Sequence, residues 1–492
     1  MIKIPQRLTA ALMLCSLVVT AVAIAADKPN IVFILCDDLG YGDVQCLNPE
    51  GGKILTPSID QFAAEGMIFT DAHSGSAVCT PTRYGLMTGR YSWRTTLQRG
   101  VVKGFRPNLI TEDRPTVASF LKTQGYHTGI VGKWHLNFQY ADPDTAELIK
   151  RNKKSVLAPI GSKIPDGPVH RGFDYFHGFH HAGDMKGVIE NDTVIAHEDE
   201  IHMLPRLTRK AVEYIETRAK NKENPFFLYV PYGSPHTPIV PSPAWQGRST
   251  LGSYADFVME TDDGVGQIMA ALEKHGFTED TLIIFSSDNG CSKEANIPKL
   301  AQQGHIVSAG YRGSKSDLWE GGHRVPFIVR WPKKVAAGTV SGQLICLTDL
   351  FATTSDITGV VMPTNSAEDS VSFLPAILED PIISTRAGVI HHSASGHFGY
   401  RQGKWKLLLA RGSGGWSSPK EGQMPKDSPK AQLYDLEKDL AETTNLYETH
   451  PEVAERLLAQ LEDDVFSGRS TTGPAAKNDV DDGKIKLWKS QK

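Results

Sequence analysis

The cysteine at position 79 begins a segment whose residue types could hold an anion beside a reactive side chain. Thr80 suits a helix N-cap, Pro81 suits the first helical position, and Gly89 suits the helix stop. A helix N-terminus offers unpaired N–H groups and positive potential, and Arg83 adds a fixed positive charge one turn further on. The segment therefore predicts an anion site against residue 79. The simpler alternative is a buried structural cysteine beside an ordinary helix.

Polar residues of complementary chemistry follow four predicted strands. Apolar, β-branched runs at 31–36, 128–132, 226–232 and 281–287 are typical of strands buried on both faces of a parallel sheet. Helical patterns lie between them, which favours a doubly wound α/β sheet whose site lies at the carboxyl ends of the strands. We therefore expect one site to gather the residues that follow these strands: Asp37 and Asp38, Lys133 and His135, His236, and Asp288 and Asn289.

The pair Asp37-Asp38 points to a metal ion. Two adjacent carboxylates at a strand end repel each other unless positive charge neutralises them. A divalent cation does this well, and hard oxygen ligands favour calcium or magnesium. The alternative for an isolated Asp-Asp pair is a solvated acidic turn.

Composition and the N-terminus limit the classes of function. The chain has 492 residues, a formal net charge of −4 and no excess of positive charge, which argues against nucleic acid as a partner. Residues 1–26 are typical of a signal peptide, with Lys3 and Arg7 before an apolar run and Ala23-Ile24-Ala25 as the cleavage site. A membrane anchor is the alternative, but the run is short for a span. We expect an exported protein, periplasmic or secreted, without stable membrane insertion.

The chain also divides into two predicted domains. Residues 27–370 hold the strand–helix alternation, with residues 136–200 predicted as a long loop region over the site. From residue 371 the pattern changes to shorter β-like runs, a helix beginning at Pro451, and a polar tail. We therefore expect residues 371–492 to form a smaller α+β domain. Six cysteines are too few for a disulfide scaffold, and no pairing follows from their spacing.

The order of short motifs along nearly the whole mature chain resembles the type I sulfatase family. The motifs are D-D-x-G, C-x-P-x-R, G-K-W-H, S-P-H-x-P, S-D-N-G, R-G-x-K and E-G-G-x-R-V-P. Thr82 stands where serine is commoner, and Asn137 where glycine often follows His-Leu. The context of Cys79 resembles the arylsulfatase A and N-acetylgalactosamine-6-sulfatase group. The resemblance implies an alkaline-phosphatase-like domain, with a mostly parallel sheet sandwiched by helices, and a C-terminal α+β domain with an antiparallel sheet.

The resemblance also implies a cofactor set and a mechanism. A maturation enzyme would convert Cys79 to formylglycine, whose hydrate is the nucleophile, and the second hydroxyl of the hydrate would allow sulfate to leave. Ca²⁺ would bind residue 79 together with the carboxylates and amide at the strand ends, Asp37, Asp38, Asp288 and Asn289. The other implied catalytic residues neutralise charge or move protons: Arg83, Lys133, His135, His236 and Lys315.

The implied substrate is a sulfated glycan that loses a 6-O-sulfate from a galactose-type sugar by exo cleavage. Candidate sugar contacts are His177, His180, His181, Trp319 and His323. One alternative is a phosphonate monoester or phosphodiester hydrolase that uses the same aldehyde. Another is a non-catalytic glycan-binding protein in which Cys79 stays a thiol. The sequence leaves the oligomeric state open.

Overall fold

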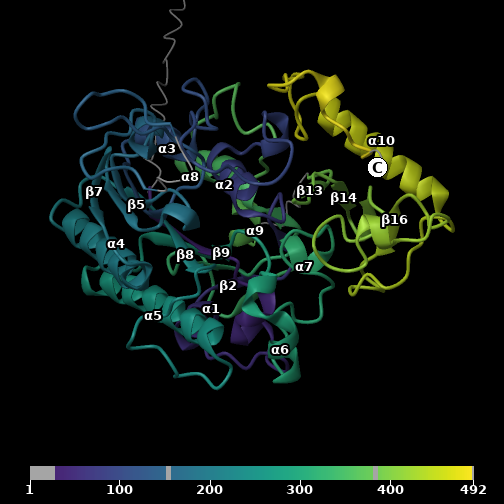
Figure 1. Cartoon of the computed structure of the whole chain (residues 1–492), viewed down its shortest axis with the longest axis horizontal. Coiled ribbons are helices and arrows are strands. Elements are labelled where there is room, and N and C mark those ends of the chain that lie inside the picture. The colour runs from purple at the N-terminus through teal and green to yellow at the C-terminus, as the bar shows by residue number, and fades with distance from the viewer. Residues whose placement is uncertain (1–27, 151–156, 380–385, 490–492) are drawn as a thin grey trace, which may run out of the picture.

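The computed structural model describes residues 28–150, 157–379 and 386–489, and the predicted signal peptide lies outside these ranges. No helix within those ranges combines the length and the apolarity that crossing a bilayer requires. In the described part of the chain, ten strands form a large mixed sheet in the order β11–β2–β10–β9–β1–β8–β4–β5–β6–β7 (Figure 1). The strands are β1 (Asn30–Asp37), β2 (Met67–Phe69), β4 (His127–Lys133), β5 (Tyr175–Phe179), β6 (Gly187–Glu190), β7 (Thr193–His197), β8 (Phe226–Pro235), β9 (Thr281–Ser287), β10 (Phe327–Arg330) and β11 (Thr339–Ser341).

The centre of the large sheet is parallel and covered on both faces. Strand β1 is buried along its whole length and pairs in parallel with β8 and β9. Its odd-numbered side chains from Ile31 to Leu35 enter one core, and its even-numbered side chains from Val32 to Cys36 enter another. The first core holds α2 (Cys79–Thr88), α3 (Val117–Thr123) and α8 (Leu350–Thr358), and the second holds α1 (Pro57–Ala64), α4 (Met203–Ala219) and α5 (Ser253–Lys274). Helices α4 and α5 lie side by side on their face (Figure 1). The predicted α/β sheet between helices is confirmed.

Residues 136–200 differ from the prediction of a loop region, because they contain β5, β6 and β7. Strand β5 continues the parallel sheet beside β4, and β6 and β7 follow it as antiparallel strands. The five residues of β5 read YFHGF and show no alternation of polar and apolar side chains. Its Gly178 is required by packing, since a Cβ there would lie 1.9 Å from the carbonyl oxygen of Gly132. A short strand with glycine at a tight contact gives no clear periodicity.

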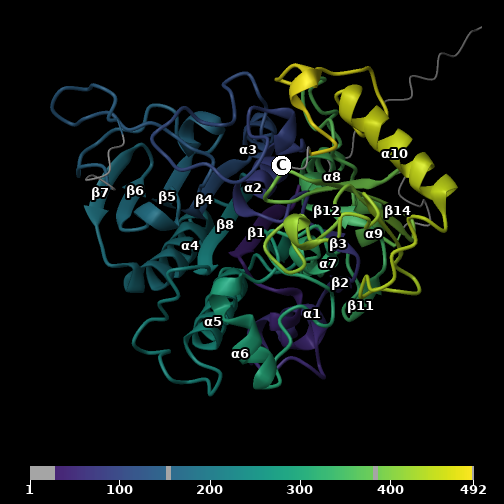
Figure 2. The same cartoon turned by 45° about the vertical axis from the view of Figure 1, so that its right-hand side comes forward.

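The C-terminal part forms the predicted α+β unit with an antiparallel sheet. Within the described residues the small sheet has four strands joined in sequence order, β13 (Val389–His392), β14 (Phe398–Gln402), β15 (Trp405–Leu408) and β16 (Gln432–Asp435). Helix α10 (Pro451–Phe466) begins with proline, as predicted, and buries Leu457, Leu461 and Val465 beside the sheet. Figure 2 shows α10 and β14 together at one side of the molecule. The domain boundary near residue 370 stays a prediction.

Short elements connect these layers. They are β3 (Ala72–His73) and β12 (Ile345–Cys346), which pair in parallel, and the helices α6 (Ile297–Gln302), α7 (Glu320–His323) and α9 (Leu374–Ile377). Along the chain, β3 lies between β2 and α2, and α7 lies just before β10. They matter below because they border the segment that carries Cys79.

A buried guanidinium group ties the segment after α2 to the end of α10. Arg94 Nη2 donates to Asp369 Oδ1 at 2.7 Å, and its Nε donates to Asp369 Oδ2 at 2.8 Å. The same guanidinium donates to the carbonyl oxygens of Asp464 and Val465 in the last turn of α10. Both charged side chains are fully buried. Arg94 therefore connects the last turn of α10, through its carbonyl oxygens, to Asp369 and to the segment after α2.

We expect Arg94→Met to lower the free energy of unfolding by about 3–5 kcal/mol, because it leaves the buried Asp369 carboxylate without its positively charged partner. Lys163→Gln is the matched control, since the Lys163–Asp192 pair has an N–O distance of 3.2 Å but is exposed to solvent. The control should cost less than about 1 kcal/mol. Denaturant unfolding measures the free energy of unfolding of both variants. Equal losses of stability would contradict the role assigned to Arg94 in holding α10.

Candidate active site

The side chains predicted to form one site do come together, and Asp37 lies at their centre. Asp37 ends β1, Lys133 ends β4, and Cys79 begins α2. Lys133 Nζ forms an ion pair with Asp37 Oδ2. Cys79 Sγ donates to Asp37 Oδ1 at 3.3 Å, and Arg83 Nη2 lies 3.5 Å from Asp37 Oδ2. All four side chains are buried.

Asp38 contacts the remaining residues of the site. Its Oδ1 forms an ion pair with Lys315 Nζ at 2.5 Å and accepts a hydrogen bond from Asn289 Nδ2 at 2.8 Å. His236 Nε2 lies 3.6 Å from its Oδ2. Lys315 Nζ is also 3.6 Å from the sulfur of Cys79, so the two halves share that position. Asp38 has φ of +66°, a left-handed conformation that costs a non-glycine residue free energy and turns its carboxylate into the site.

Arg83 is fixed by three hydrogen bonds on one side of the site. Its Nε and Nη2 donate to Asp288 Oδ2 at 3.1 and 2.8 Å, and its Nη1 donates to the Lys133 carbonyl at 3.0 Å. The other oxygen of Asp288 accepts from the backbone N–H of Asp38 at 3.2 Å. Asp288 therefore links the helix that carries Arg83 to the turn after β1.

Burial and neighbouring charges shift the protonation of these groups. Burial alone would raise the pKa of Asp37, but Lys133 and His236 hold that pKa well below its usual range. Burial alone would lower the pKa of Lys315, but Asp38 raises it above its ordinary value. Burial, and then Asp37, raise the pKa of the Cys79 thiol far above that of a free cysteine. The carboxylate and the amine stay charged, and the thiol stays protonated.

His135 lies beside the start of α2 and is a neutral imidazole. Burial and then the charge of Lys133 lower its pKa well below 6.5. Its Nε2 donates to the Val102 carbonyl at 3.2 Å, and among the described residues its Nδ1 has no hydrogen-bond partner. His135 also has φ of +56°. The free nitrogen can therefore accept a proton.

The start of α2 differs from the prediction for Thr80 and Pro81. The N-cap residue is Val78, so Pro81 is the third helical residue, and Thr80 does not cap. Thr80 Oγ1 instead donates to the His135 carbonyl at 3.0 Å and accepts from the Val102 N–H at 3.3 Å. Gly89 ends the helix with φ of +64°, as predicted. The Thr80 hydroxyl therefore positions the backbone of His135 and does not cap the helix.

Burial and then Asp37 raise the pKa of Asp288 to about 7, and when Asp288 is ionised beside Arg83 the charges of the site balance before any ligand binds. The three cations are Arg83, Lys133 and Lys315, and the three carboxylates are Asp37, Asp38 and Asp288. A site without net charge gains little by binding a lone anion. A divalent cation would add two positive charges and make the same cavity favourable for an anionic ester.

The donor set fits such a cation. Asn289 Nδ2 donates to Asp38 and to the Gly290 carbonyl, which orients the amide. The Asn289 Oδ1 that this leaves is buried and has no hydrogen-bond partner among the described residues. Its neighbours are carboxylate oxygens, so the ligand set is the hard oxygen type that calcium and magnesium prefer. A bound metal ion would give the unpaired Asn289 Oδ1 a partner.

The predicted sugar contacts separate into two groups. His180 and His181 lie near His135, with ring centroids 6.0 and 5.8 Å from its ring. Trp319 and His323 are buried and offer no surface to a sugar. His177 is also buried, on β5, with Nδ1 3.5 Å from Glu190. His180 is fully buried as well, so we withdraw His177, His180, Trp319 and His323 as sugar contacts and keep His181, which is partly exposed.

The burial of Trp319 has a physical reason that short motifs do not reveal. Its indole N–H donates to Gln432 Oε1 on β16 at 3.1 Å, and the Arg312 guanidinium lies 3.7 Å from the centroid of its ring. The tryptophan therefore packs against the small sheet. His323 instead lies in a cluster of histidines that is described below.

Sequence reasoning missed Asp317, which joins the Lys315 loop to the C-terminal part. Asp317 Oδ1 accepts from the N–H groups of Trp416 and Ser417 at 2.8 and 3.0 Å, and Oδ2 accepts from the Ser314 N–H at 2.9 Å. Trp416 is 39% exposed, so the residue whose backbone N–H binds Asp317 also places an aromatic side chain on the surface. Asp317 and its partners Trp416 and Ser417 are about a hundred residues apart in sequence. The one sequence signal for this contact is an acidic residue close to Lys315.

Comparison with known proteins identifies the family of the chain. The sulfatase family profile matches residues 29–360, and a profile described as the C-terminal part of N-sulphoglucosamine sulphohydrolase matches residues 314–467. The chain belongs to the sulfatase family. N-acetylgalactosamine-6-O-sulfatase of Bacteroides thetaiotaomicron is 30% identical, and the alignment covers 89% of this chain and 93% of that relative. Arylsulfatase A of Bos taurus is 30% identical, with 94% and 93% covered.

Solved structures agree with this sulfatase fold. A structure from work on glycosaminoglycan metabolism by Bacteroides thetaiotaomicron superposes with a TM-score of 0.76 at 29% identity, covering 89% of this chain and 99% of that chain. The structure of Ps i-CgsB in complex with k-i-k-neocarrahexaose gives a TM-score of 0.71 at 25% identity, covering 91% and 95%. This sulfatase is a sulfuric ester hydrolase, as predicted.

Proposed function

We propose that this sulfatase removes the 6-O-sulfate from a terminal galactose or N-acetylgalactosamine residue of a sulfated glycan, with formylglycine at position 79 and Ca²⁺. The observation that carries the proposal is the balanced set of buried charges around Cys79, with the amide oxygen of Asn289 left over. In the net reaction water adds across the sulfur–oxygen bond, so that its oxygen goes to sulfate and one proton goes to the alcohol. No oxidant or reductant is consumed.

Three cations hold the sulfate group and neutralise its charge. Arg83, Lys133 and Lys315 reach the sulfur of Cys79 or the carboxylate that accepts its hydrogen bond. Charge spreads over the sulfate oxygens as the ester bond breaks, and donors fixed in a dry site stabilise it better than water does. Arg83 is the most rigid of the three because Asp288 holds it by two hydrogen bonds.

Residue 79 supplies the attacking group. Its thiol is protonated in this site, since burial and Asp37 raise its pKa, so an unmodified cysteine is a poor nucleophile. Formylglycine would supply a hydrated aldehyde, with one hydroxyl to attack sulfur and a second to let sulfate leave. A maturation enzyme that forms formylglycine is therefore a required partner.

Two histidines move the protons. His236 Nδ1 donates to the Thr237 carbonyl at 2.5 Å, so its Nε2 faces Asp38 and can carry a proton to the leaving alcohol. Burial lowers the pKa of His236, whereas Asp38 favours its charged form. Lys315 assists at the same oxygen. His135 accepts a proton through the free Nδ1 when sulfate is released.

The strand-end oxygens hold the metal ion. The ligands that we assign are Asp37, Asp38, Asp288 and Asn289 together with the formylglycine at residue 79, and Ca²⁺ would supply positive charge to the bound sulfate. Asn289 is the ligand whose substitution tests this with least disturbance, because its Oδ1 makes no hydrogen bond within the described residues.

We expect Asn289→Ala to raise the calcium concentration needed for half-maximal activity by roughly 10- to 100-fold, as loss of one oxygen ligand costs about 1–3 kcal/mol. Activity is measured in calcium titrations after chelation. Asn48→Ala is a control, because Asn48 is also a buried asparagine but caps a turn through the Gly42 carbonyl. An Asn289→Ala enzyme with an unchanged calcium requirement would contradict the assignment.

Conversion of Cys79 is tested by mass spectrometry of the peptide that contains it, on protein from the native host. We expect a loss of roughly 18 Da relative to the thiol, and a fall in kcat of at least about 10⁴-fold for Cys79→Ala. Cys346→Ala controls for removal of a buried thiol. An unmodified thiol in active enzyme would contradict the nucleophile, and an unmodified thiol without activity would favour a glycan-binding protein.

The choice of sugar rests on relatives named N-acetylgalactosamine-6-O-sulfatase and N-acetylgalactosamine-6-sulfatase. Candidates for sugar contact are the partly exposed His181, beside His135, and the exposed Trp416, whose ring suits the apolar face of a pyranose. The signal peptide predicted at residues 1–26 would deliver the enzyme to the periplasm or the exterior, where such glycans occur.

We expect kcat/KM for galactose 6-sulfate and N-acetylgalactosamine 6-sulfate to exceed that for glucosamine 6-sulfate by about 10-fold or more, since a mispaired hydroxyl costs roughly 1–3 kcal/mol. Sulfate release from each sugar measures this. Equal turnover would contradict the galacto preference. Faster hydrolysis of a phosphonate monoester or phosphodiester would favour the alternative hydrolase.

A further inference from the structure

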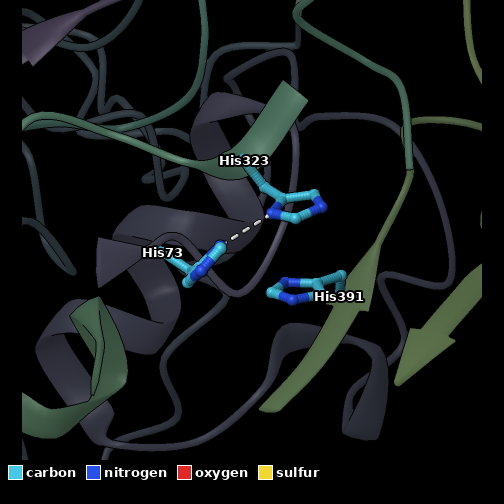
Figure 3. Close-up of side chains that lie close together, drawn as sticks. All are labelled: His73, His323 and His391. Atoms are coloured by element: carbon cyan, nitrogen blue, oxygen red, sulfur yellow. Dashed lines mark hydrogen bonds between the residues drawn. The ribbon is translucent and has the colours of Figure 1, made fainter. Parts of the chain in front are cut away.

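Three histidines from distant parts of the chain form a second cluster, separate from the proposed active site. His73 belongs to β3, His323 ends α7, and His391 lies in β13. All three side chains are fully buried, and their rings face one another (Figure 3). One ring nitrogen from each lies within 4.8 Å of the others.

The hydrogen bonds of two of these rings fix where their protons lie. His323 Nε2 is 2.9 Å from the Leu318 carbonyl, which can only accept, so this nitrogen carries hydrogen. His73 Nε2 is 2.8 Å from Asp71 Oδ1. Asp71 is a carboxylate, because Arg324 Nη1 and Arg401 Nη2 lie 3.1 and 3.3 Å from its oxygens. His73 Nε2 is therefore also a donor.

The remaining nitrogens of this pair then face each other as two acceptors. His73 Nδ1 and His323 Nδ1 are 3.1 Å apart. In neutral rings with protonated Nε2, both Nδ1 atoms present lone pairs, and only a proton or a cation between them makes the contact favourable. An added proton is opposed by burial, which lowers the pKa of both histidines. Two nitrogens bound to one tetrahedral zinc ion at about 2.0–2.1 Å would lie about 3.3 Å apart.

His391 points to the same conclusion by an independent observation. Its ring stacks on His323 with centroids 3.7 Å apart, and neither of its nitrogens has a hydrogen-bond partner among the described residues. A buried imidazole with both nitrogens unsatisfied is costly. Because the rings are nearly parallel, His391 must turn to bring a nitrogen toward the other two, and turning it breaks no hydrogen bond.

We propose that His73, His323 and His391 bind a first-row transition-metal ion, of which zinc is the representative. The surroundings are those of metal-bound histidines, whose second nitrogen donates to a carboxylate or a backbone carbonyl. Asp71 and the Leu318 carbonyl fill these places. Imidazole ligands suit zinc, copper and nickel, so the cluster is chemically distinct from the oxygen ligands assigned to calcium.

Metal binding here would join β3 and α7 to β13 of the small sheet, beside the segment that leads to Cys79. The ligands come from β3, α7 and β13, which are far apart in sequence. The Ser74 N–H donates to the His323 carbonyl at 2.8 Å, and the Ala77 N–H donates to the His392 carbonyl at 3.0 Å. The segment between β3 and α2 is therefore held by α7 and β13, which also supply two of the ligands. The ion would stabilise this part of the fold without touching substrate.

The test compares His391→Phe with His392→Phe in the full-length enzyme. Phenylalanine keeps the ring volume at either position and removes its nitrogens. His392 is the matched control, because it is buried on the same strand and packs on Phe398 outside the cluster. Each protein is treated with chelator, given excess Ca²⁺ to fill the oxygen site, and then titrated with Zn²⁺ and separately with Co²⁺.

We expect wild type and His392→Phe to bind about one zinc ion per chain, to unfold at a temperature a few degrees higher with zinc, and to give the strong visible absorption of four-coordinate cobalt. His391→Phe should lose all three responses while keeping a normal calcium requirement. Equal zinc content in the two variants, or no zinc binding by wild type, would overturn the proposal. A normal calcium requirement in every protein separates this outcome from failure of the proposed catalytic site.

Discussion

The mutual neutralisation of six buried charges is the constraint on which the active-site edge of the large sheet depends. Asp37 and Asp38 end the central strand in a place that water does not reach, and they are tolerated there because Lys133 and Lys315 pair with them. Removing one partner from such a pair typically costs about 3–5 kcal/mol. The site is therefore a single electrostatic unit rather than a collection of separate side chains.

This charge balance also explains how the amines could leave the carboxylates and bind an anion instead. The amines that we assign to sulfate are the ones that pair with the carboxylates in the structure. A calcium ion at the carboxylates would compete with the amines for the same oxygens and so free them for an anion. Cation and anion binding are then coupled through shared groups, and neither needs a change in the sheet.

The sequence was sufficient to predict the central sheet and the groups at its edge, because long apolar strands and the polar residues after them follow simple physical rules. It failed where packing at long range decides the outcome. Strand β5 could not be recognised because it contains Gly178, a residue with low strand propensity. Glycine is needed there because the backbone lies close to Gly132. Trp319 looked available for a sugar, but Gln432 from the small sheet binds its indole. The capping role expected of Thr80 was also wrong, because its hydroxyl binds the backbone of His135.

The burial of α2 has a consequence for the order of events in the life of the chain. Every residue of this helix is buried, and Cys79 is only 2% exposed. An enzyme that modifies Cys79 cannot reach it once α2 has packed between β1 and α8. Under the proposed conversion of Cys79, modification and folding would compete for the same nascent segment, and a chain that folds first would be excluded from activation. The fraction of active enzyme is then a kinetic quantity, set by how long the segment stays accessible during synthesis and export.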